Sequence, residues 1–170
     1  MLGKNQGAPI KLFVICLDKT FEQRCKPTLD ELKSCNANIE LIPFDAVKGK
    51  DVEHNLLHPF AMRTALTGNR DIDDQLSHVN QAGCSLSHIK LWEKTVELDE
   101  PVIIAEDDLF DGKTCGLLNF FNLIEDHMGF VSMQNLVNKS SPYSGTFRKL
   151  HSFIGTGLYY ITPDTAKKIT

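Results

Sequence analysis

The opening of the chain restricts the fold more than any other part. Residues 11–17 are a continuous apolar run rather than an alternating one, which is typical of a strand covered on both faces. Thr20 is a potential N-cap for a helix, and Pro27 either kinks that helix or starts a second one. Residues 39–42 have the composition of a second strand. A β-α-β opening of this kind favours a parallel pair of strands joined by a right-handed crossover.

The rest of the chain continues this alternation of strands and helices. The clearest helix is expected from about residue 79 to residue 98, where Leu86, Ile89 and Val96 share one face. Further expectations are strands at 102–105, 129–133, 151–154 and 158–161, helical pieces at 51–57, 60–66 and 117–127, a helix starting at Thr162, a loop at 138–145 and a mobile stretch at 71–74. This pattern predicts an α/β sandwich around a mostly parallel sheet. We expect one domain over residues 10–170, after a disordered segment at 1–9.

Charge and cysteine usage exclude several classes of protein. The formal net charge of −4 argues against nucleic-acid binding, which needs a basic surface. No apolar stretch approaches the ~20 residues of a membrane span, so any membrane association is expected to be peripheral. The five cysteines are odd in number and include no C-x-x-C pair, which indicates neither a zinc site nor a full disulfide framework. We expect reduced, mostly structural thiols in a cytoplasmic protein.

Three consecutive carboxylates, Glu106, Asp107 and Asp108, directly follow the apolar run at residues 101–105. Acids this close at the end of a buried strand repel one another, and each raises the pKa of its neighbours unless a positive group compensates. A hard divalent cation such as Mg²⁺ or Mn²⁺ is the usual partner of carboxylate oxygens. The carboxyl ends of strands in open α/β sheets are also where ligands bind. The alternative is a solvated acidic turn, continued by Asp111 and its following glycine.

Three segments together resemble a known family. The first is Val14-Ile15-Cys16-Leu17-Asp18 with Arg24 shortly after, the second is Gly83-Cys84-Ser85-Leu86-Ser87-His88 running into Trp92, and the third is Ile103-Ile104-Ala105-Glu106-Asp107-Asp108. In this order they resemble glycosyltransferase family 25, which includes bacterial lipooligosaccharide galactosyltransferases and animal collagen galactosyltransferases. The loop at 45–49 and the glycine turn at 155–157 resemble further parts of that family.

The resemblance implies a GT-A-like, Rossmann-type fold and a metal-dependent glycosyltransferase. It implies a UDP-sugar donor, most often UDP-galactose, with Mn²⁺ or Mg²⁺ as cofactor and net inversion at the anomeric carbon. The implied acceptor is an oligosaccharide or glycolipid, such as the lipooligosaccharide of a cell surface. For such an acceptor, we expect a cytoplasmic protein that works at the inner face of the membrane.

By analogy with a D-x-D element, Glu106 and Asp108 are the expected metal ligands, and Glu106 also contacts the donor. Asp107 and Asp108 are the expected catalytic residues, with a structural role on the other side of the strand as the alternative for Asp107. The expected donor-binding residues are Asp18, Arg24, Val47, Ser87, His88 and Glu106. Asp18 as a helix cap, Arg24 as a solvated charge and His88 as a hydrogen-bonded core residue are the alternatives. Trp92 is expected to belong to the core.

The match leaves the catalytic base unassigned. An inverting transferase needs a carboxylate near the acceptor hydroxyl, and only Asp126, His127 and Asp164 suggest themselves. Family members usually extend further, so the acceptor half is expected to be incomplete. Three alternatives therefore stay open: a nucleotide-sugar-binding protein with little or no turnover, a nucleotidyltransferase, and a scaffold whose acids are only surface charge. The nucleotidyltransferase is disfavoured because residues 17–21 lack a glycine-rich phosphate loop.

Overall fold

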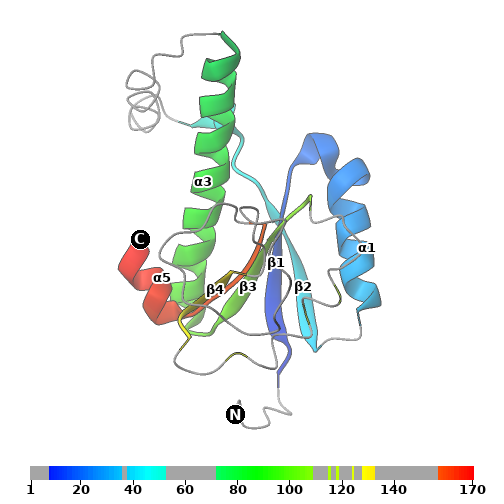
Figure 1. The fold of residues 1–170 in the computed structure, drawn as a ribbon, viewed down its shortest axis with the longest axis vertical. Helices are drawn as coiled ribbons and strands as arrows, with labels where there is room; N and C mark the ends of the chain where they lie inside the picture. The colour runs from blue at the N-terminus through cyan, green and yellow to red at the C-terminus, as the bar shows by residue number, and fades with distance from the viewer. Residues whose placement is uncertain are drawn as a thin grey trace, which may run out of the picture.

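The computed structural model describes residues 8–35, 38–52, 72–108, 115, 118, 124, 128–132 and 157–170, with side chains of the helix at 72–98 described from residue 79 onward. These residues form three layers, in which a central sheet lies between helices (Figure 1). Helix α1 (Lys26–Ser34) covers one face of the sheet. Helices α3 (Ile72–Leu98) and α5 (Pro163–Ile169) cover the other. The predicted α/β sandwich is therefore confirmed for the described part of the chain.

The sheet has five strands in the order β2-β1-β3-β5-β4. Their bounds are Ile10–Cys16 for β1, Ile39–Asp45 for β2, Val102–Glu106 for β3, Phe130–Ser132 for β4 and Leu158–Ile161 for β5. Strand β1 pairs in parallel with both β2 and β3, while β5 is antiparallel to both of its neighbours, β3 and β4. The sheet is thus mostly parallel, as predicted, with β5 reversed.

Each face of the sheet carries its own set of buried side chains, because successive strand residues point to opposite sides. The face toward α1 includes Leu12, Val14, Ile103 and Ala105 from the central strands, packed with Leu29 and Leu32 of α1. The face toward α3 and α5 includes Phe13, Ile15, Val102 and Ile104, packed with Leu91 and Ala166. Burial on both faces explains why β1 and β3 are continuous apolar runs rather than alternating ones.

The start of α1 differs from the prediction. Thr20 does not cap a helix with its side chain; its hydroxyl donates to the Leu17 carbonyl oxygen at 3.4 Å instead. The chain passes through a 3-10 turn (Asp18–Thr20) and a π-helical turn (Phe21–Cys25) directly into α1. Because helical backbone precedes α1 without a break, no extended N-cap residue stands there. Pro27 lies in the first turn of α1, where its missing N–H costs nothing.

Helix α3 begins at Ile72, seven residues before the predicted start at 79. The stretch at 71–74, which we expect to be mobile, is helical from Ile72 onward, and its mobility stays a prediction. The helix is followed by Asp99, whose φ of 52° places it in the left-handed region that often terminates helices.

The C-terminal elements agree with the sequence. Strands β4 and β5 match two of the predicted strands, and α5 follows Thr162, whose hydroxyl oxygen accepts from the Thr165 backbone N–H. Several other expectations lie wholly or mostly outside the described residues: the helical pieces at 51–57, 60–66 and 117–127, the loop at 138–145, the strand at 151–154 and most of the glycine turn at 155–157. These stay predictions.

The expectation of reduced thiols is wrong for four of the five cysteines. Disulfides join Cys16 to Cys25 and Cys35 to Cys115, with Cα–Cα distances of 5.4 and 5.1 Å that fit ordinary disulfide geometry. Only Cys84 is a free thiol. The number and spacing of the cysteines did not predict these disulfides, because each bond joins two different parts of the fold. Disulfides persist mainly in oxidising compartments, so they remove the thiol argument for a cytoplasmic protein.

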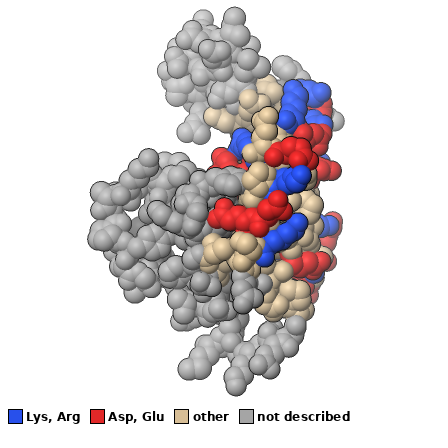
Figure 2. Space-filling view, turned by 90° about the vertical axis from the view of Figure 1, so that its right-hand side faces the viewer, with Lys and Arg blue, Asp and Glu red and all other residues tan. Residues whose placement is uncertain are grey.

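Two surface observations complete the fold. On the side of the molecule where α1 lies, acidic and basic side chains are interspersed (Figure 2). The exposed ion pairs Lys26–Glu22 and Lys33–Asp30 involve residues of α1 and of the turn before it. Among the described residues, no helix is long and apolar enough to cross a membrane.

Candidate functional site

The strand order creates a switch point between β1 and β3. After β1 the chain passes through α1 to β2 on one side, and after β2 it passes through α3 to β3 on the other side. The two connections lie on opposite faces of the sheet (Figure 1). Ligands of open α/β sheets bind outside the carboxyl ends of strands at such a point. Here Asp18 lies two residues after β1, Glu106 is the last residue of β3, and Asp107 and Asp108 follow it.

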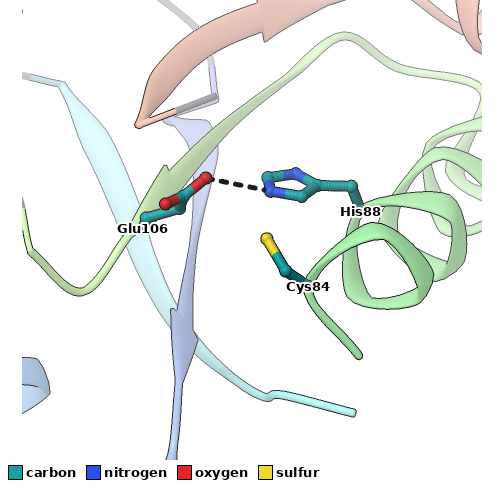
Figure 3. Close-up of side chains that lie close together, drawn as sticks. All are labelled: Cys84, His88 and Glu106. Atoms are coloured by element: carbon teal, nitrogen blue, oxygen red, sulfur yellow. Dashed lines mark hydrogen bonds and ion pairs between the residues drawn. The ribbon is translucent and has the colours of Figure 1, made fainter. Parts of the chain in front are cut away.

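The first two acids diverge as they leave β3. Glu106 continues the even-numbered face of the strand and lies toward α3, where its Oε1 is 3.2 Å from Nε2 of His88 (Figure 3). Asp107 lies on the α1 side, where Thr28 donates to its backbone carbonyl oxygen at 3.0 Å. The predicted cluster is therefore two environments rather than one, because strand residues alternate between faces.

A buried hydrogen-bond network fixes the ring of His88. The Tyr159 hydroxyl lies 2.8 Å from Nδ1 of His88 and accepts from the indole N–H of Trp92 at 2.9 Å. Because indole nitrogen is only a donor, the hydroxyl hydrogen of Tyr159 is free to be donated to Nδ1. In neutral His88, Nε2 then carries the proton and donates to Glu106. Burial raises the pKa of Tyr159, which keeps this hydroxyl protonated.

Cys84 lies next to this network, one helical turn before His88. Its side chain points from α3 toward the same space as His88 and Glu106 (Figure 3). Burial, followed by the negative charges of Glu106 and Asp108, raises the pKa of the Cys84 thiol to about 11. An open pocket of about 160 Å³ adjoins it, lined by Cys84, Ser85, His88, Ile89 and Trp92. Ligand sites usually occupy ~300–1,000 Å³, so this pocket alone would not hold a nucleotide sugar.

On the other side of β3, Arg24 joins two of the acids. Its guanidinium lies 2.7 Å from Oδ1 of Asp107 and 3.2 Å from Oδ2 of Asp108. The Asp107 side chain is 6% exposed, whereas those of Arg24 and Asp108 are 41% and 56% exposed. Burial raises the pKa of Asp107, and the charge of Arg24 opposes that rise. Arg24 thus helps a buried carboxylate to remain charged.

Asp18, at the end of β1, is exposed and forms an ion pair with Lys48. The hydrogen bond from Lys48, and then its charge, lower the pKa of Asp18. Lys48 belongs to the loop after β2, so this pair links the carboxyl ends of two neighbouring parallel strands.

Two glycines allow that loop to lie directly on α3. A Cβ on Gly83 would come within 2.6 Å of the Val47 carbonyl oxygen and 2.8 Å of the Gly49 nitrogen. A Cβ on Gly49 would likewise collide with the backbone carbonyl of Val79. The hydroxyl of Ser87 accepts from the Val47 backbone N–H at 2.9 Å and donates to the Gly83 carbonyl at 2.8 Å. Ser87 is completely buried, so water does not compete for these two hydrogen bonds, and they hold the loop in place.

The structure brings the expected site residues together in pairs. Glu106 meets His88, Arg24 meets Asp107 and Asp108, and Val47 meets Ser87. Asp164 is not among them, because it follows Ile161, which pairs with Val102 at the opposite end of β3 from Glu106. Asp126 and His127 lie outside the described residues.

Sequence reasoning missed three residues of this region: Cys84, Lys48 and Tyr159. Cys84 precedes His88 by four residues, a helical spacing that places two side chains on one face, and that signal was available. Trp92, expected in the core, is half-buried and has a definite partner in Tyr159.

An α/β protein with this sheet topology has the build of a protein that binds a ligand at the switch point. Comparison with known families identifies it further. The model of glycosyltransferase family 25 (LPS biosynthesis protein) matches residues 10–141, which is more than half of the 170-residue chain. The chain therefore belongs to glycosyltransferase family 25, and the resemblance seen in the motifs is confirmed. No curated protein matches the chain.

Proposed function

We propose that the chain is a metal-dependent galactosyltransferase that transfers galactose from UDP-galactose, with inversion, to a cell-surface glycan such as lipooligosaccharide. Membership of a glycosyltransferase family supports sugar transfer as the reaction class. The observation that carries the finer proposal is the position of Glu106 and Asp108 at the carboxyl end of the central strand β3, beside the switch point. We assign residues 10–170 to one GT-A-like domain.

The nucleotide end of the donor is proposed to lie at the carboxyl end of β1. Arg24 is 41% exposed and already binds carboxylate oxygens, and its planar guanidinium suits phosphate oxygens equally well. Asp18, two residues after β1, is exposed and pairs with Lys48, which would supply a second cation. The Val47 loop and Ser87 are proposed to shape this edge rather than to bind by hydrogen bonds, because their backbone N–H and hydroxyl are already engaged.

The residues present fit a hard divalent cation. Glu106 and Asp108 supply carboxylate oxygens, and Mg²⁺ and Mn²⁺ in proteins commonly take only one or two of these together with phosphate oxygens. Asp108 is more than half exposed, so its oxygens are accessible. The cation, when bound, would stabilise the negative charge that develops on the departing nucleoside diphosphate.

Within the acidic cluster, Asp108 is the better candidate for contact with substrate. Asp107 is buried and paired with Arg24 on the α1 side, so we propose that it positions Arg24, although the sequence suggested a catalytic role. His88 is proposed to hold Glu106 in place from the α3 side through its Nε2. None of the described carboxylates has a position that assigns the catalytic base.

The place of action that we propose is the cytoplasmic face of a membrane, where a glycolipid acceptor would be presented to a peripheral enzyme. The two disulfides weigh against this part of the proposal, because a reducing cytosol does not preserve them. Rapid alkylation of thiols at cell lysis decides it. Five alkylated cysteines would support a cytoplasmic enzyme, and one would place the enzyme in an oxidising compartment.

Donor binding tests the proposal most directly. We expect UDP-galactose and Mn²⁺ together to raise the melting temperature by several degrees, because a ligand at 100 times its dissociation constant adds about 2.7 kcal/mol to the native state. Asp108→Asn should remove most of that shift, whereas Asp30→Asn, which changes an exposed acid on α1, should keep it. An unchanged shift in Asp108→Asn would overturn the assignment of the metal.

Turnover separates the proposal from its alternatives. Release of UDP that depends on a glycan acceptor supports a transferase, and anomeric analysis of the product tests inversion. Donor binding without release indicates a nucleotide-sugar-binding protein. Release of pyrophosphate from a nucleoside triphosphate indicates a nucleotidyltransferase. Absence of all binding indicates a scaffold.

A further inference from the structure

Cys84, His88 and Glu106 form a compact group of three potential metal ligands. One ligand atom from each residue lies within 4.8 Å of the other two, and all three side chains point into one space between α3 and β3 (Figure 3). Zinc binds sulfur at about 2.3 Å and histidine nitrogen or carboxylate oxygen at about 2.0–2.2 Å. Two ligand atoms that bind one tetrahedral ion at these lengths therefore lie about 3–4 Å apart. Side-chain adjustments of about 1 Å would therefore bring the three atoms around a single cation.

The backbone already holds these ligands in place. Cys84 and His88 are four residues apart on α3, so they share one face of the helix, as paired ligands of helical zinc sites do. Glu106 is the last residue of β3, a central strand of the sheet. Ligands on a helix and a strand are more rigidly positioned than ligands on loops.

The surroundings of His88 match the second shell of a metal-binding histidine. Such a residue normally donates its other ring N–H to a fixed acceptor. The Tyr159 hydroxyl is 2.8 Å from Nδ1 and is itself fixed by the indole of Trp92. When Nε2 binds a cation, the imidazole proton moves to Nδ1 and is donated to Tyr159, while the Cys84 thiol releases its proton to solvent.

We propose that Cys84 Sγ, His88 Nε2 and a carboxylate oxygen of Glu106 bind a zinc-class divalent cation. A thiolate and an imidazole select Zn²⁺ over Mg²⁺, which prefers oxygen ligands alone. Three protein ligands leave one tetrahedral position open, the arrangement of catalytic rather than structural zinc sites. The pocket lined by Cys84, His88 and Trp92 gives small molecules access to that position.

The site shares Glu106 with the proposed donor site but does not depend on it. It concerns binding of a cation without nucleotide, and two of its three ligands, Cys84 and His88, lie on α3. The zinc-class site and the donor site can therefore fail separately, provided that the probe detects the bond between the cation and the Cys84 thiolate.

Cobalt supplies that probe, because a thiolate bound to Co²⁺ gives a charge-transfer absorption in the near ultraviolet. We would remove metal from the unreduced chain with a chelator, titrate Co²⁺, and displace it with Zn²⁺ or with Mg²⁺. Cys84 is the single free thiol, so the charge-transfer band should appear in the wild type, disappear on addition of Zn²⁺ and persist with Mg²⁺. Its absence in the wild type would overturn the proposal, whatever the variants do.

Variants assign the ligands. Cys84→Ser should abolish the band and weaken Zn²⁺ binding by more than about 100-fold, the upper end of the loss for an outer-shell residue. Tyr159→Phe should weaken binding about 10-fold and keep the band. Ser85→Ala, which alters the pocket lining but no ligand, should match the wild type. Equal Zn²⁺ affinity in wild type and Cys84→Ser would contradict the site. If UDP-galactose with Mn²⁺ still binds Cys84→Ser, the donor proposal stands independently of this result.

Discussion

Glu106 and Asp107 are adjacent in the chain but face opposite layers of the protein. Glu106 lies 3.2 Å from His88 on the α3 side, and Asp107 lies 2.7 Å from Arg24 on the α1 side. The alternation of strand residues divides the acidic motif in this way. A carboxylate at the edge of the proposed donor site and a carboxylate that is paired within the fold therefore follow one another, and substitutions at the two positions should have different consequences.

Removing Arg24 should destabilise the protein through Asp107. Arg24→Met leaves a buried carboxylate without its cation, a change that costs about 3–5 kcal/mol for fully buried pairs. Because Arg24 is 41% exposed, solvent reduces the effect, and we expect about 2 kcal/mol at neutral pH. Urea unfolding in the presence of a chelator measures it. The matched change Lys33→Met, which removes an exposed ion pair with Asp30, should cost no more than about 0.5 kcal/mol.

A double-mutant cycle and the pH dependence of stability identify the cause of the destabilisation in Arg24→Met. Asp107→Asn should remove most of the penalty of Arg24→Met, because no buried charge remains. The pKa of Asp107 is raised in the folded protein, so its contribution to stability is greatest below its unfolded pKa and decreases as the pH rises through the folded pKa. The penalty of Arg24→Met should accordingly grow as the pH rises from the acid range. A penalty that is independent of both pH and Asp107 would mean that lost packing, not charge, is responsible.

Gly83→Ala should destabilise the protein although alanine favours helices. Alanine gains about 1 kcal/mol over glycine in a helix interior. The new Cβ, however, would stand 2.6 Å from the Val47 carbonyl oxygen and 2.8 Å from the Gly49 nitrogen, and backbone atoms cannot rotate away as a side chain can. Such overpacking costs about 1–3 kcal/mol, so a net loss is expected in thermal or urea unfolding. Asn80→Ala, at an exposed position of the same helix, is the control and should be neutral or stabilising.

Because four cysteines form disulfides, we expect one reactive thiol per chain. Under denaturing but non-reducing conditions, the purified chain should react as one thiol, that of Cys84. The Cys35–Cys115 bond closes a loop with a sequence separation of 80, and loop entropy assigns it about 4.5 kcal/mol. The Cys16–Cys25 bond, with a separation of 9, should contribute about 2.5 kcal/mol. Reduction should therefore lower the melting temperature substantially. Five reactive thiols before reduction would disprove both bonds.

The sheet and its acidic edge could be predicted because their signals are local. The apolar runs of β1 and β3 reflect burial on both faces, and Glu106 ends β3 directly after its apolar run. The parallel pairing of β1 with β2 follows from one short β-α-β unit. Each of these inferences needs only neighbouring residues and the period of the pattern.

The features that escaped prediction depend on contacts between distant residues. Tyr159 meets His88 across a separation of 71 residues, and that contact exists only because β5 pairs with β3. The partner of Cys35 is likewise set by the fold rather than by spacing. The early start of α3 was missed for a different reason: its first residues are polar and break the apolar period that identified the rest of the helix.

Lys48 should depress the pKa of Asp18 measurably. The hydrogen bond from Lys48, and then its charge, lower that pKa from the ordinary value of 3.8. A lowered folded pKa means that the stabilisation is present above the unfolded pKa and is lost as the pH falls through the folded one. Carboxyl-carbon NMR titration of Asp18 should give a midpoint below 3.8 in the wild type. Because both side chains are exposed, added salt should raise the midpoint.

Two substitutions show whether this pair links the ends of β1 and β2. Lys48→Gln should return the Asp18 midpoint to its ordinary range, whereas Lys50→Gln, which changes a nearby lysine that does not pair with Asp18, should leave it depressed. A midpoint that moves equally in both variants would indicate a diffuse field from the loop rather than a specific ion pair. If Asp18 and Lys48 also belong to the donor site, saturating UDP-galactose and Mn²⁺ should change the Asp18 resonance in the wild type at constant pH. An unchanged resonance in the fully bound protein would place the donor away from the end of β1.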